Sequence, residues 1–331
     1  TMAGYEVVKL GTDERGGVDV EDLKAKVGDD VACLMLTNPN TLGLFDPAIL
    51  SASGPSDLFQ AGDRTPLPES LAGGFAYVPS PDGTRVVYGT GNGGCEGNDV
   101  TKVANIDGTD VQTLPAAPEG LNICGARWSP DGTKLVFQVR DGANPDDVGD
   151  LFVQDLPTGR WTQVTDLELT RAWWWFLSPS FSDNGKNVIF HLPRDSSQNT
   201  TWNVWSVRSE GGEYARRPYT LLLRNASFPV PGLDLPNDVS IAFVSPLSDS
   251  FAGQRIMTAR PTPEEDLRSK VVEANDSIWF PRTSPDGSMI AYQDGGSIYI
   301  ADLGLLKGEY SKVADGNTAE WLDNDTLIIA P

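Results

Sequence analysis

A small group of aromatic and basic residues could bind a ligand. Its members are Trp173, Trp174, His191, Arg194 and Trp202. Exposed aromatic rings beside a cation and an imidazole can form a platform for a sugar ring or a peptide side chain. Bulky aromatic residues also fill protein interiors, so packing between structural elements is the alternative interpretation. We treat the five residues as candidates for the rim of a binding surface.

Other kinds of chemistry find little support in the sequence. His191 is the single histidine of the chain, and no cluster of cysteines accompanies it. A zinc site needs several such ligands, so we predict no metal site. The acidic segment at residues 141–150 lacks the alternation of a calcium loop, and we interpret it as solvated. The chain also has no Gly-x-Ser-x-Gly elbow and no Gly-rich phosphate loop. We therefore expect a protein that is not an enzyme and uses no cofactor.

The charge of the chain restricts its partners further. The 331 residues include 25 lysines and arginines and 46 acidic residues, which gives a net charge of −21. A surface this acidic repels phosphate backbones, so we expect no nucleic-acid partner. No apolar run approaches the roughly 20 residues that cross a bilayer, so we expect no membrane span. The first residue is threonine, and we expect any export signal to be absent or to lie outside this chain.

A short phrase repeats along the chain and must supply the elements that position these residues. An aromatic or apolar residue precedes Ser-Pro-Asp-Gly, or once Ser-Asp-Asn-Gly, and a hydrophobic run follows. The copies end at Gly83, Gly132, Gly185 and Gly287, so the steps are 49, 53 and 102 residues, the last being two periods of 51. Pro and Asp-Gly favour a tight reversal between strands. A repeat of roughly 40–50 residues made of short strands is typical of a four-stranded propeller blade.

The repeat resembles that of the TolB-type β-propeller. The resemblance rests on the Ser-Pro-Asp-Gly phrase and on following hairpins such as Asp150–Asp155 and Ser297–Asp302, and it covers about residues 55–331. It implies an all-β propeller. Members of this family serve as envelope scaffolds and as accessory domains of peptidases. The resemblance therefore implies a binding protein in an extracytoplasmic compartment, the periplasm or cell envelope.

We expect six blades, with both termini contributing to the last one. Five blades are predicted to begin near Phe75, Asn122, Trp175, Asp238 and Ser277. Segments at about 56–68 and at 318–331 each resemble half a blade, and joining them closes the ring without unpaired edges. The fourth blade lacks the Ser-Pro-Asp-Gly turn, so its start is predicted from the strand-like run Val239–Phe243. The propeller domain would then span residues 51–331.

Two cysteines are predicted to meet on one rim of the propeller. In a blade whose first strand is innermost, the turn entering that strand and the turn between the second and third strands share a rim. Cys95 lies in a turn of the second kind, and Cys124 enters the next blade. We expect a disulfide between them, and two unrelated thiols are the alternative. The bond would indicate an oxidising compartment. The same reasoning assigns Trp173 and His191 to this rim.

Residues 1–50 do not belong to the repeat. Tyr5–Lys9, Val18–Val27 and Val31–Leu36 have the patterns of a strand, an amphipathic helix and a buried strand, which predicts a β-α-β appendage. The string from 37 to 45, Thr-Asn-Pro-Asn-Thr-Leu-Gly-Leu-Phe, is similar to the glycine decarboxylase P-protein, a pyridoxal-phosphate enzyme. That family anchors its cofactor on a lysine in a His-Lys context, whereas His191 is followed by Leu192. The fragment is therefore predicted to be inactive, either a fusion joint or a cap.

We expect the whole chain to be a monomeric, non-catalytic binding or scaffold propeller. Its partner would be a protein, with carbohydrate as the alternative, and binding would use one rim or the central channel. Two further functions stay open. One is a propeller-based enzyme such as a polysaccharide lyase, or a peptidase accessory domain, which a stoichiometric bound metal would favour. The other is an inactive remnant of a glycine dehydrogenase (decarboxylating).

Overall fold

The structure is a computed structural model. It describes residues 68–71, 74–91, 100–144, 148–167, 177–193, 202–211, 219–231, 241–246, 254–261, 266–274, 278–303 and 310–330. The chain divides into two units, Thr1–Arg64 and Thr65–Pro331. The first unit lies outside the described residues, and so does the predicted β-α-β appendage. The boundary predicted near residue 50 stays a prediction.

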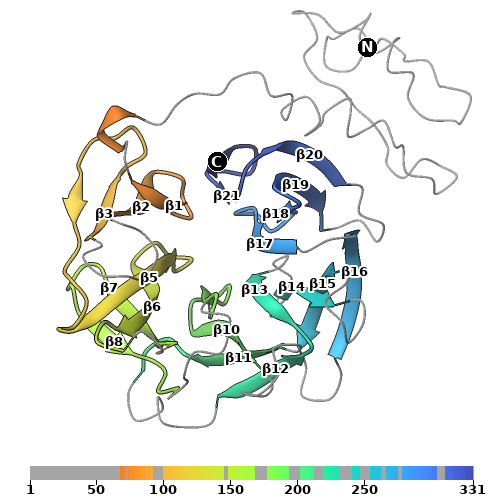
Figure 1. The fold of residues 1–331 in the computed structure, drawn as a ribbon, viewed down its shortest axis with the longest axis horizontal. Coiled ribbons are helices and arrows are strands. Elements are labelled where there is room, and N and C mark those ends of the chain that lie inside the picture. The colour runs from red at the N-terminus through yellow and green to blue at the C-terminus, as the bar shows by residue number, and fades with distance from the viewer. Residues whose placement is uncertain are drawn as a thin grey trace, which may run out of the picture. The chain divides into compact units, whose positions relative to one another are not determined.

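Five four-stranded sheets and one two-stranded sheet make up the described part of the second unit (Figure 1). The first contains β1 (Phe75–Pro79), β2 (Arg85–Thr90), β3 (Val100–Asn105) and β4 (Gln112–Thr113), and the second β5 (Leu121–Trp128), β6 (Lys134–Asp141), β7 (Asp150–Asp155) and β8 (Trp161–Gln163). The third contains β9 (Ser180–Phe181), β10 (Asn187–Pro193), β11 (Trp202–Arg208) and β12 (Thr220–Arg224), and the fourth β13 (Ser227–Pro231), β14 (Ile241–Pro246), β15 (Gln254–Pro261) and β16 (Asp266–Ala274). The fifth contains β17 (Ile278–Thr283), β18 (Met289–Asp294), β19 (Ser297–Asp302) and β20 (Tyr310–Asp315), and the two-stranded sheet β21 (Thr318–Trp321) and β22 (Leu327–Ala330). A single 3-10 turn, η1 (Glu69–Leu71), precedes them among the described residues.

The sheets form a ring around a common centre. Within each sheet, strands consecutive in sequence pair antiparallel, so every sheet is a meander. The first strands of the sheets contact one another in the cyclic order β1, β5, β9, β13, β17 and β21, and β21 contacts β1 again. Figure 1 shows β1, β13, β17 and β21 nearest the middle and β3, β16 and β20 at the outside. The predicted all-β propeller fold is thereby confirmed.

The repeated phrase forms the turn between the first two strands of a sheet, as predicted. In the first sheet Ser80 Oγ donates to Asp82 Oδ1 (2.5 Å), and the same Asp82 oxygen accepts the Thr84 N–H (3.1 Å). The Arg85 N–H donates back to Ser80 Oγ (3.0 Å). Gly83 has φ +68°, and a Cβ atom there would lie 2.7 Å from the carbonyl oxygen of Leu322. Local hydrogen bonds and one glycine conformation therefore define the turn.

Tryptophan side chains join neighbouring sheets at the end of the innermost strand. Trp128 Nε1 donates to the carbonyl oxygen of Val78 in the preceding sheet (2.8 Å). Trp321 Nε1 donates to the carbonyl oxygen of Arg282, also in its preceding sheet (2.8 Å). Trp128 also belongs to the apolar core between the first two sheets, with Phe137. The two tryptophans occupy the same position of the repeat, so the same hydrogen bond joins two different pairs of neighbouring sheets.

The fourth sheet corrects one prediction. Its first strand is β13 (Ser227–Pro231), and the strand predicted to open the blade, Val239–Phe243, corresponds to the second strand, β14. The prediction was wrong by one strand because this sheet has no Ser-Pro-Asp-Gly turn to mark its first hairpin. The predicted completion of the sixth blade by residues 56–68 concerns a segment that lies outside the described residues, apart from 68 itself. No helix among the described residues is long and apolar enough to cross a membrane.

Candidate functional site

Residues from the first strand of every described sheet line a cavity of about 320 Å³ at the centre of the ring, and one of them recurs at an equivalent position in all six sheets. The residues at this position are Val78, Arg127, Ser180, Val230, Arg282 and Glu320. They occupy equivalent registers, since each lies opposite the same position of the second strand, as in Val78 opposite Val87 and Arg127 opposite Val136. We call them the channel residues. The repeat therefore places an equivalent residue of each sheet at the channel, although Val78 and Val230 also belong to the apolar cores between sheets.

A backbone irregularity precedes the channel residue in all five four-stranded sheets. The residue two positions earlier has positive φ: Ala76 (51°), Gly125 (154°), Ser178 (44°), Phe228 (49°) and Phe280 (49°). In four of these sheets the register of the first strand shifts at this point. Such bulges twist a strand and redirect the side chain that follows. Positive φ is costly for alanine, serine or phenylalanine, so the surrounding structure must impose it.

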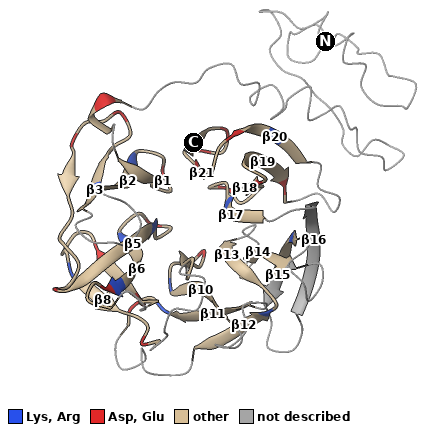
Figure 2. Cartoon of the chain, in the orientation of Figure 1, with Lys and Arg blue, Asp and Glu red and all other residues tan. Residues whose placement is uncertain are grey.

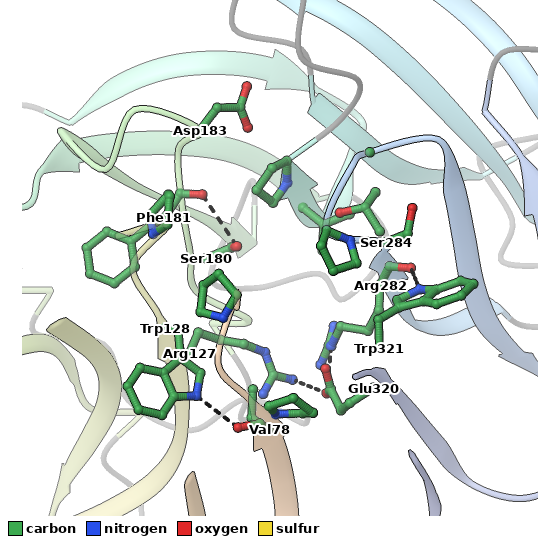
Figure 3. A pocket seen from close by; sticks show the side chains of 18 of the residues that line it. Val78, Arg127, Trp128, Ser180, Phe181, Asp183, Arg282, Ser284, Glu320 and Trp321 are labelled. Carbon is green, nitrogen blue, oxygen red and sulfur yellow. Dashed lines mark hydrogen bonds and ion pairs between the residues drawn. The ribbon is translucent and has the colours of Figure 1, made fainter. Parts of the chain in front are cut away.

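Three charged channel residues form an ion cluster (Figure 3). Glu320 Oε1 lies 2.9 Å from Arg127 Nη2 and 2.8 Å from Arg282 Nε. Each arginine also donates its Nη1 to the carbonyl oxygen of the preceding residue, Ala126 or Pro281, at 2.8 Å. The side chains retain 24% exposure at Arg127, 12% at Arg282 and 14% at Glu320. The cluster therefore spans the channel between three sheets while remaining open to the cavity.

The cluster carries more positive than negative charge. Burial raises the pKa of the Glu320 carboxyl, and the charge and hydrogen bond of Arg282 act in the opposite direction. Arginine stays protonated in proteins, and here two guanidinium groups donate to one carboxylate oxygen. With Glu320 ionised, the three side chains sum to a charge of +1. Figure 2 shows acidic and basic residues scattered around the propeller, with basic colour at β17 near the centre of the ring.

The remaining wall of the cavity is poor in hydrogen-bond donors. Seven of its residues are prolines, which have no N–H: Pro79, Pro81, Pro130, Pro179, Pro229, Pro231 and Pro285. Trp128, Phe181 and Trp321 add aromatic surface. The hydroxyls of two lining serines, Ser80 and Ser284, already donate to the aspartates of their own turns. The two arginines are the only cationic donors in the described lining of the cavity.

The cavity extends to the rim that carries the Ser-Pro-Asp-Gly turns, and we call this end of the cavity its mouth. Its lining includes residues of four such turns, among them Ser80, Pro130, Asp183 and Asp286. Because the strands are antiparallel, these turns lie at the opposite ends of the strands from the rim predicted to carry the binding residues. In Figure 3 Asp183 lies apart from the arginines. The mouth thus carries carboxyl groups, whereas the arginines lie further along the strands.

Of the five predicted rim residues, the structure describes His191 and Trp202. His191 is 2% exposed, and its Nδ1 accepts the N–H of Phe228 at 2.7 Å. Its ring packs against Trp202 and Phe228, with centroids 4.7 and 4.9 Å away. His191 is therefore a core residue with a satisfied ring nitrogen, and Trp202 is half-buried beside it. The other three candidates, Trp173, Trp174 and Arg194, lie outside the described residues.

Cys124 is disulfide-bonded. The other two cysteines of the chain, Cys33 and Cys95, lie outside the described residues, so the pairing of Cys124 with Cys95 stays a prediction. Cys124 itself lies in β5, three residues before the channel residue Arg127. Among the described residues, no group of three or more histidine, cysteine, aspartate or glutamate side chains could hold a metal ion.

Sequence reasoning missed the ion cluster, although the repeat contains a signal for it. The channel residue stands two positions before the serine of the phrase, as in Arg127-Trp-Ser-Pro-Asp-Gly and Arg282-Thr-Ser-Pro-Asp-Gly. The corresponding position of the C-terminal sheet is Glu320, two positions before Leu322. Aligning the copies on this serine reveals arginine at one position of two repeats, and the C-terminal sheet has Glu320 at the equivalent position. Only the direction of the side chains, which the structure supplies, identifies that position as the channel.

The propeller resembles solved propellers at the level of fold. TolB from Acinetobacter baumannii is 16% identical, with a TM-score of 0.50, over 74% of this chain and 55% of that one. An oligogalacturonate lyase in complex with manganese is 16% identical, with a TM-score of 0.51, over 74% of this chain and 66% of that one. Identities this low describe the fold alone. The predicted resemblance to TolB-type propellers is confirmed at that level, and no family model matches the chain.

The N-terminal resemblance is confirmed as a match to a fragment. A probable glycine dehydrogenase (decarboxylating) subunit 2 from Exiguobacterium sibiricum is 60% identical over 50 residues. The matched stretch is 15% of this chain and 10% of that protein. The same subunit from Lysinibacillus sphaericus is 56% identical over 50 residues, again 10% of its length. The chain therefore spans only about a tenth of these curated relatives.

Proposed function

We propose that this protein is a non-catalytic binding propeller that takes a segment of a protein partner into its central channel. The observation that carries the proposal is the shared register of the six channel residues around one cavity. A cavity of about 320 Å³ lies at the lower end of the size range of ligand pockets. Its Pro-rich and aromatic wall provides a rigid apolar surface, and its charged cluster can orient a bound segment through hydrogen bonds. This arrangement suits recognition of a chain segment.

The polar groups of the wall support a binding role over a catalytic one. Ser80 and Ser284 donate their hydroxyl protons to turn aspartates and accept the N–H groups of Arg85 and Met289. Both hydroxyls therefore serve the turns, where the hydroxyl proton is held by a turn aspartate and the oxygen accepts a backbone N–H. The arginines and Glu320 bind one another. Each of these groups has a structural partner, which suits a surface that holds a ligand without transforming it.

Three further features of the protein belong to this proposal. Residues 56–68 complete the sheet of β21 and β22 as a sixth blade, because a two-stranded sheet within a ring of four-stranded ones leaves an edge to be paired. The protein works in an extracytoplasmic compartment, which the disulfide at Cys124 supports. The glycine dehydrogenase fragment at residues 1–50 takes no part in binding and has no activity of its own.

A plugged channel tests the proposed function. Peptides selected by display against the wild-type protein should lose binding at least tenfold in Ser180→Trp, since Ser180 is a channel residue and an indole there occupies the cavity. Thr113→Trp, on the exposed outer strand β4, is the matched control and should bind as the wild type does. Melting temperatures of both variants check that the fold is retained. Selected peptides that bind Ser180→Trp with unchanged affinity would show that the channel is not the binding site.

A further inference from the structure

The two channel arginines have N–H groups that no hydrogen bond or ion pair within the described part of the chain uses. Arg127 donates from Nη1 to the carbonyl oxygen of Ala126 and from Nη2 to Glu320. Arg282 donates from Nη1 to the carbonyl oxygen of Pro281 and from Nε to Glu320. Arg127 Nε and Arg282 Nη2 therefore have no partner among the described residues. Both side chains keep some exposure to the cavity. A ligand with suitable acceptors could receive these bonds.

The contacts of Glu320 show that the two arginines bind a carboxylate. A carboxylate of the protein itself lies between the two guanidinium groups, with both ion pairs made to Oε1 at 2.8–2.9 Å. Guanidinium groups bind carboxylates through charge-assisted hydrogen bonds, which are stronger than neutral ones. Because the cluster sums to +1 with Glu320 ionised, one further negative charge would neutralise it. The site is therefore suited to a single additional carboxylate.

The surroundings restrict the molecule that carries this carboxylate. The chain as a whole has a net charge of −21, and Asp183 and Asp286 line the mouth, so a polyanion is repelled. A polyhydroxylated sugar needs many hydrogen-bond partners, whereas seven of the 23 lining residues are prolines and the hydroxyls of Ser80 and Ser284 are engaged in their turns. A neutral or basic peptide with a free C-terminal carboxylate meets both restrictions. Its last residues would contact the proline and tryptophan wall.

We propose that the channel binds the C-terminal end of a neutral or basic peptide, with its terminal carboxylate held by Arg127 and Arg282. The inference rests on the proposed function, because it names the chemistry of the segment that enters the channel. Glu320 competes with the incoming carboxylate for the guanidinium groups. The Glu320 carboxylate thus already occupies part of the site. The carboxylate of a partner must either bind the arginines beside Glu320 or displace it.

The test compares a free acid with its amide. Side-chain N–H resonances of Arg127 and Arg282, assigned by nuclear magnetic resonance, are followed during titration with N-acetyl-alanyl-alanine or its C-terminal amide. We expect the acid to shift both resonances with a Kd of about 1–10 mM, as a small ligand making few contacts should. The amide should bind at least tenfold more weakly. Acid and amide of equal affinity, or no shift with either, would overturn the inference.

Three variants sharpen the comparison. Arg127→Gln and Arg282→Gln should each weaken binding of the acid about tenfold or more, while Arg208→Gln, at the exposed end of β11, should leave it unchanged. Glu320→Gln should tighten binding of the acid several-fold, because the competing charge is removed and an amide oxygen still accepts from the arginines. Weaker binding in Glu320→Gln would contradict the competition. The acid–amide comparison in the wild type decides the inference even where a variant is poorly folded.

The outcomes separate this inference from the proposed function. Display-selected peptides that bind equally well as acids and amides, and that lose binding in Ser180→Trp, would leave the channel as the binding site and remove the role of the terminal carboxylate. Selected peptides unaffected by Ser180→Trp would remove the proposed function itself. Saturable binding of N-acetyl-alanyl-alanine at the arginines, with selected peptides bound elsewhere, would support the carboxylate site and contradict the proposed route of the partner.

Discussion

The indole N–H of two tryptophans determines how neighbouring sheets are joined. Trp128→Phe or Trp321→Phe removes the donor to the carbonyl oxygen of Val78 or Arg282. We expect each to lower the free energy of unfolding by about 1–3 kcal/mol, because a carbonyl oxygen in the packed interface between sheets loses its partner. Trp161→Phe is the matched control, since Trp161 Nε1 is buried without a hydrogen-bond partner in the described part of the chain. Urea unfolding measures all three, and an equal loss in the control would contradict a specific role for the N–H.

His191 contributes to stability through its Nδ1 acceptor. The N–H of Phe228, a residue with φ +49°, donates to it inside the core. His191→Leu keeps an apolar volume but removes the acceptor, and it should lower the free energy of unfolding by about 1–3 kcal/mol more than His191→Asn, whose Oδ1 can occupy the position of Nδ1. Chemical denaturation of both variants measures the difference. Equal stability would indicate that the hydrogen bond to Phe228 contributes nothing.

Each Ser-Pro-Asp-Gly turn makes the propeller sensitive to acid. The hydrogen bond from Ser80 lowers the pKa of Asp82 from its ordinary value of 3.8. At Asp131 and Asp286 burial acts to raise the pKa, but the hydrogen bonds from the turn outweigh it, so both pKa values are also lowered. A carboxyl group with a lowered folded-state pKa stabilises the fold above pH 3.8 and ceases to do so as the pH falls through its folded-state pKa. Stability should therefore fall on acidification below about pH 4.

Asparagine at the three turns should reduce this sensitivity. Asn184 already occupies the aspartate position of one turn, where it accepts from Ser182 Oγ and the Lys186 N–H at 3.0 Å. The triple variant Asp82→Asn, Asp131→Asn, Asp286→Asn should be somewhat less stable than the wild type at pH 7, because neutral hydrogen bonds are weaker. It should lose less stability between pH 7 and pH 2.5. Urea midpoints at both pH values measure this, and an equal loss in both proteins would be the contrary result.

The bulge before the channel stores backbone strain that glycine can relieve. Ala76 has φ +51° and an exposed side chain. A non-glycine residue in this conformation costs about 1–2 kcal/mol, while glycine costs about 0.5–1 kcal/mol in unfolded-state entropy. Ala76→Gly should therefore raise the free energy of unfolding by about 0.5 kcal/mol. Ala126→Gly, beside a channel residue in β5 and without positive φ, should lower it by about 0.5–1 kcal/mol. Denaturant unfolding of both variants measures the two changes in the free energy of unfolding. Changes of the same sign would contradict the explanation.

We expect the ring to unfold as one cooperative unit that depends on its C-terminal sheet, because β21 contacts both β17 and β1. Deleting residues 319–331 removes β22 and most of β21, including Glu320 and Trp321, and with them contacts to β1 and β17. We expect the melting temperature to fall by about 10 °C or the transition to lose its cooperativity. Deleting residues 1–50 should leave a single transition within about 2 °C of the full chain. Calorimetry of both truncations decides, and loss of cooperative melting in the second would show that the N-terminal fragment is integral.

The sequence by itself determined the repeat, its turns and its fold class. Ser80, Asp82 and Gly83 build their turn from hydrogen bonds that reach no further than five residues, so local sequence contains the whole instruction. The same holds for the other copies of the phrase. Where the phrase is missing, in the sheet that begins at β13, the predicted start was wrong because no local signal replaces it.

Only the tertiary structure decided where the site lies. Arg127, Arg282 and Glu320 come from three sheets, and they meet because the ring brings equivalent positions of distant repeats to one centre. His191 has the residue type of a ligand-binding side chain, yet the third sheet buries it against Phe228. Which side chains face the channel and which face the core depends on strand twist, bulges and ring closure. These are properties of the assembled sheets, and no short stretch of sequence contains them.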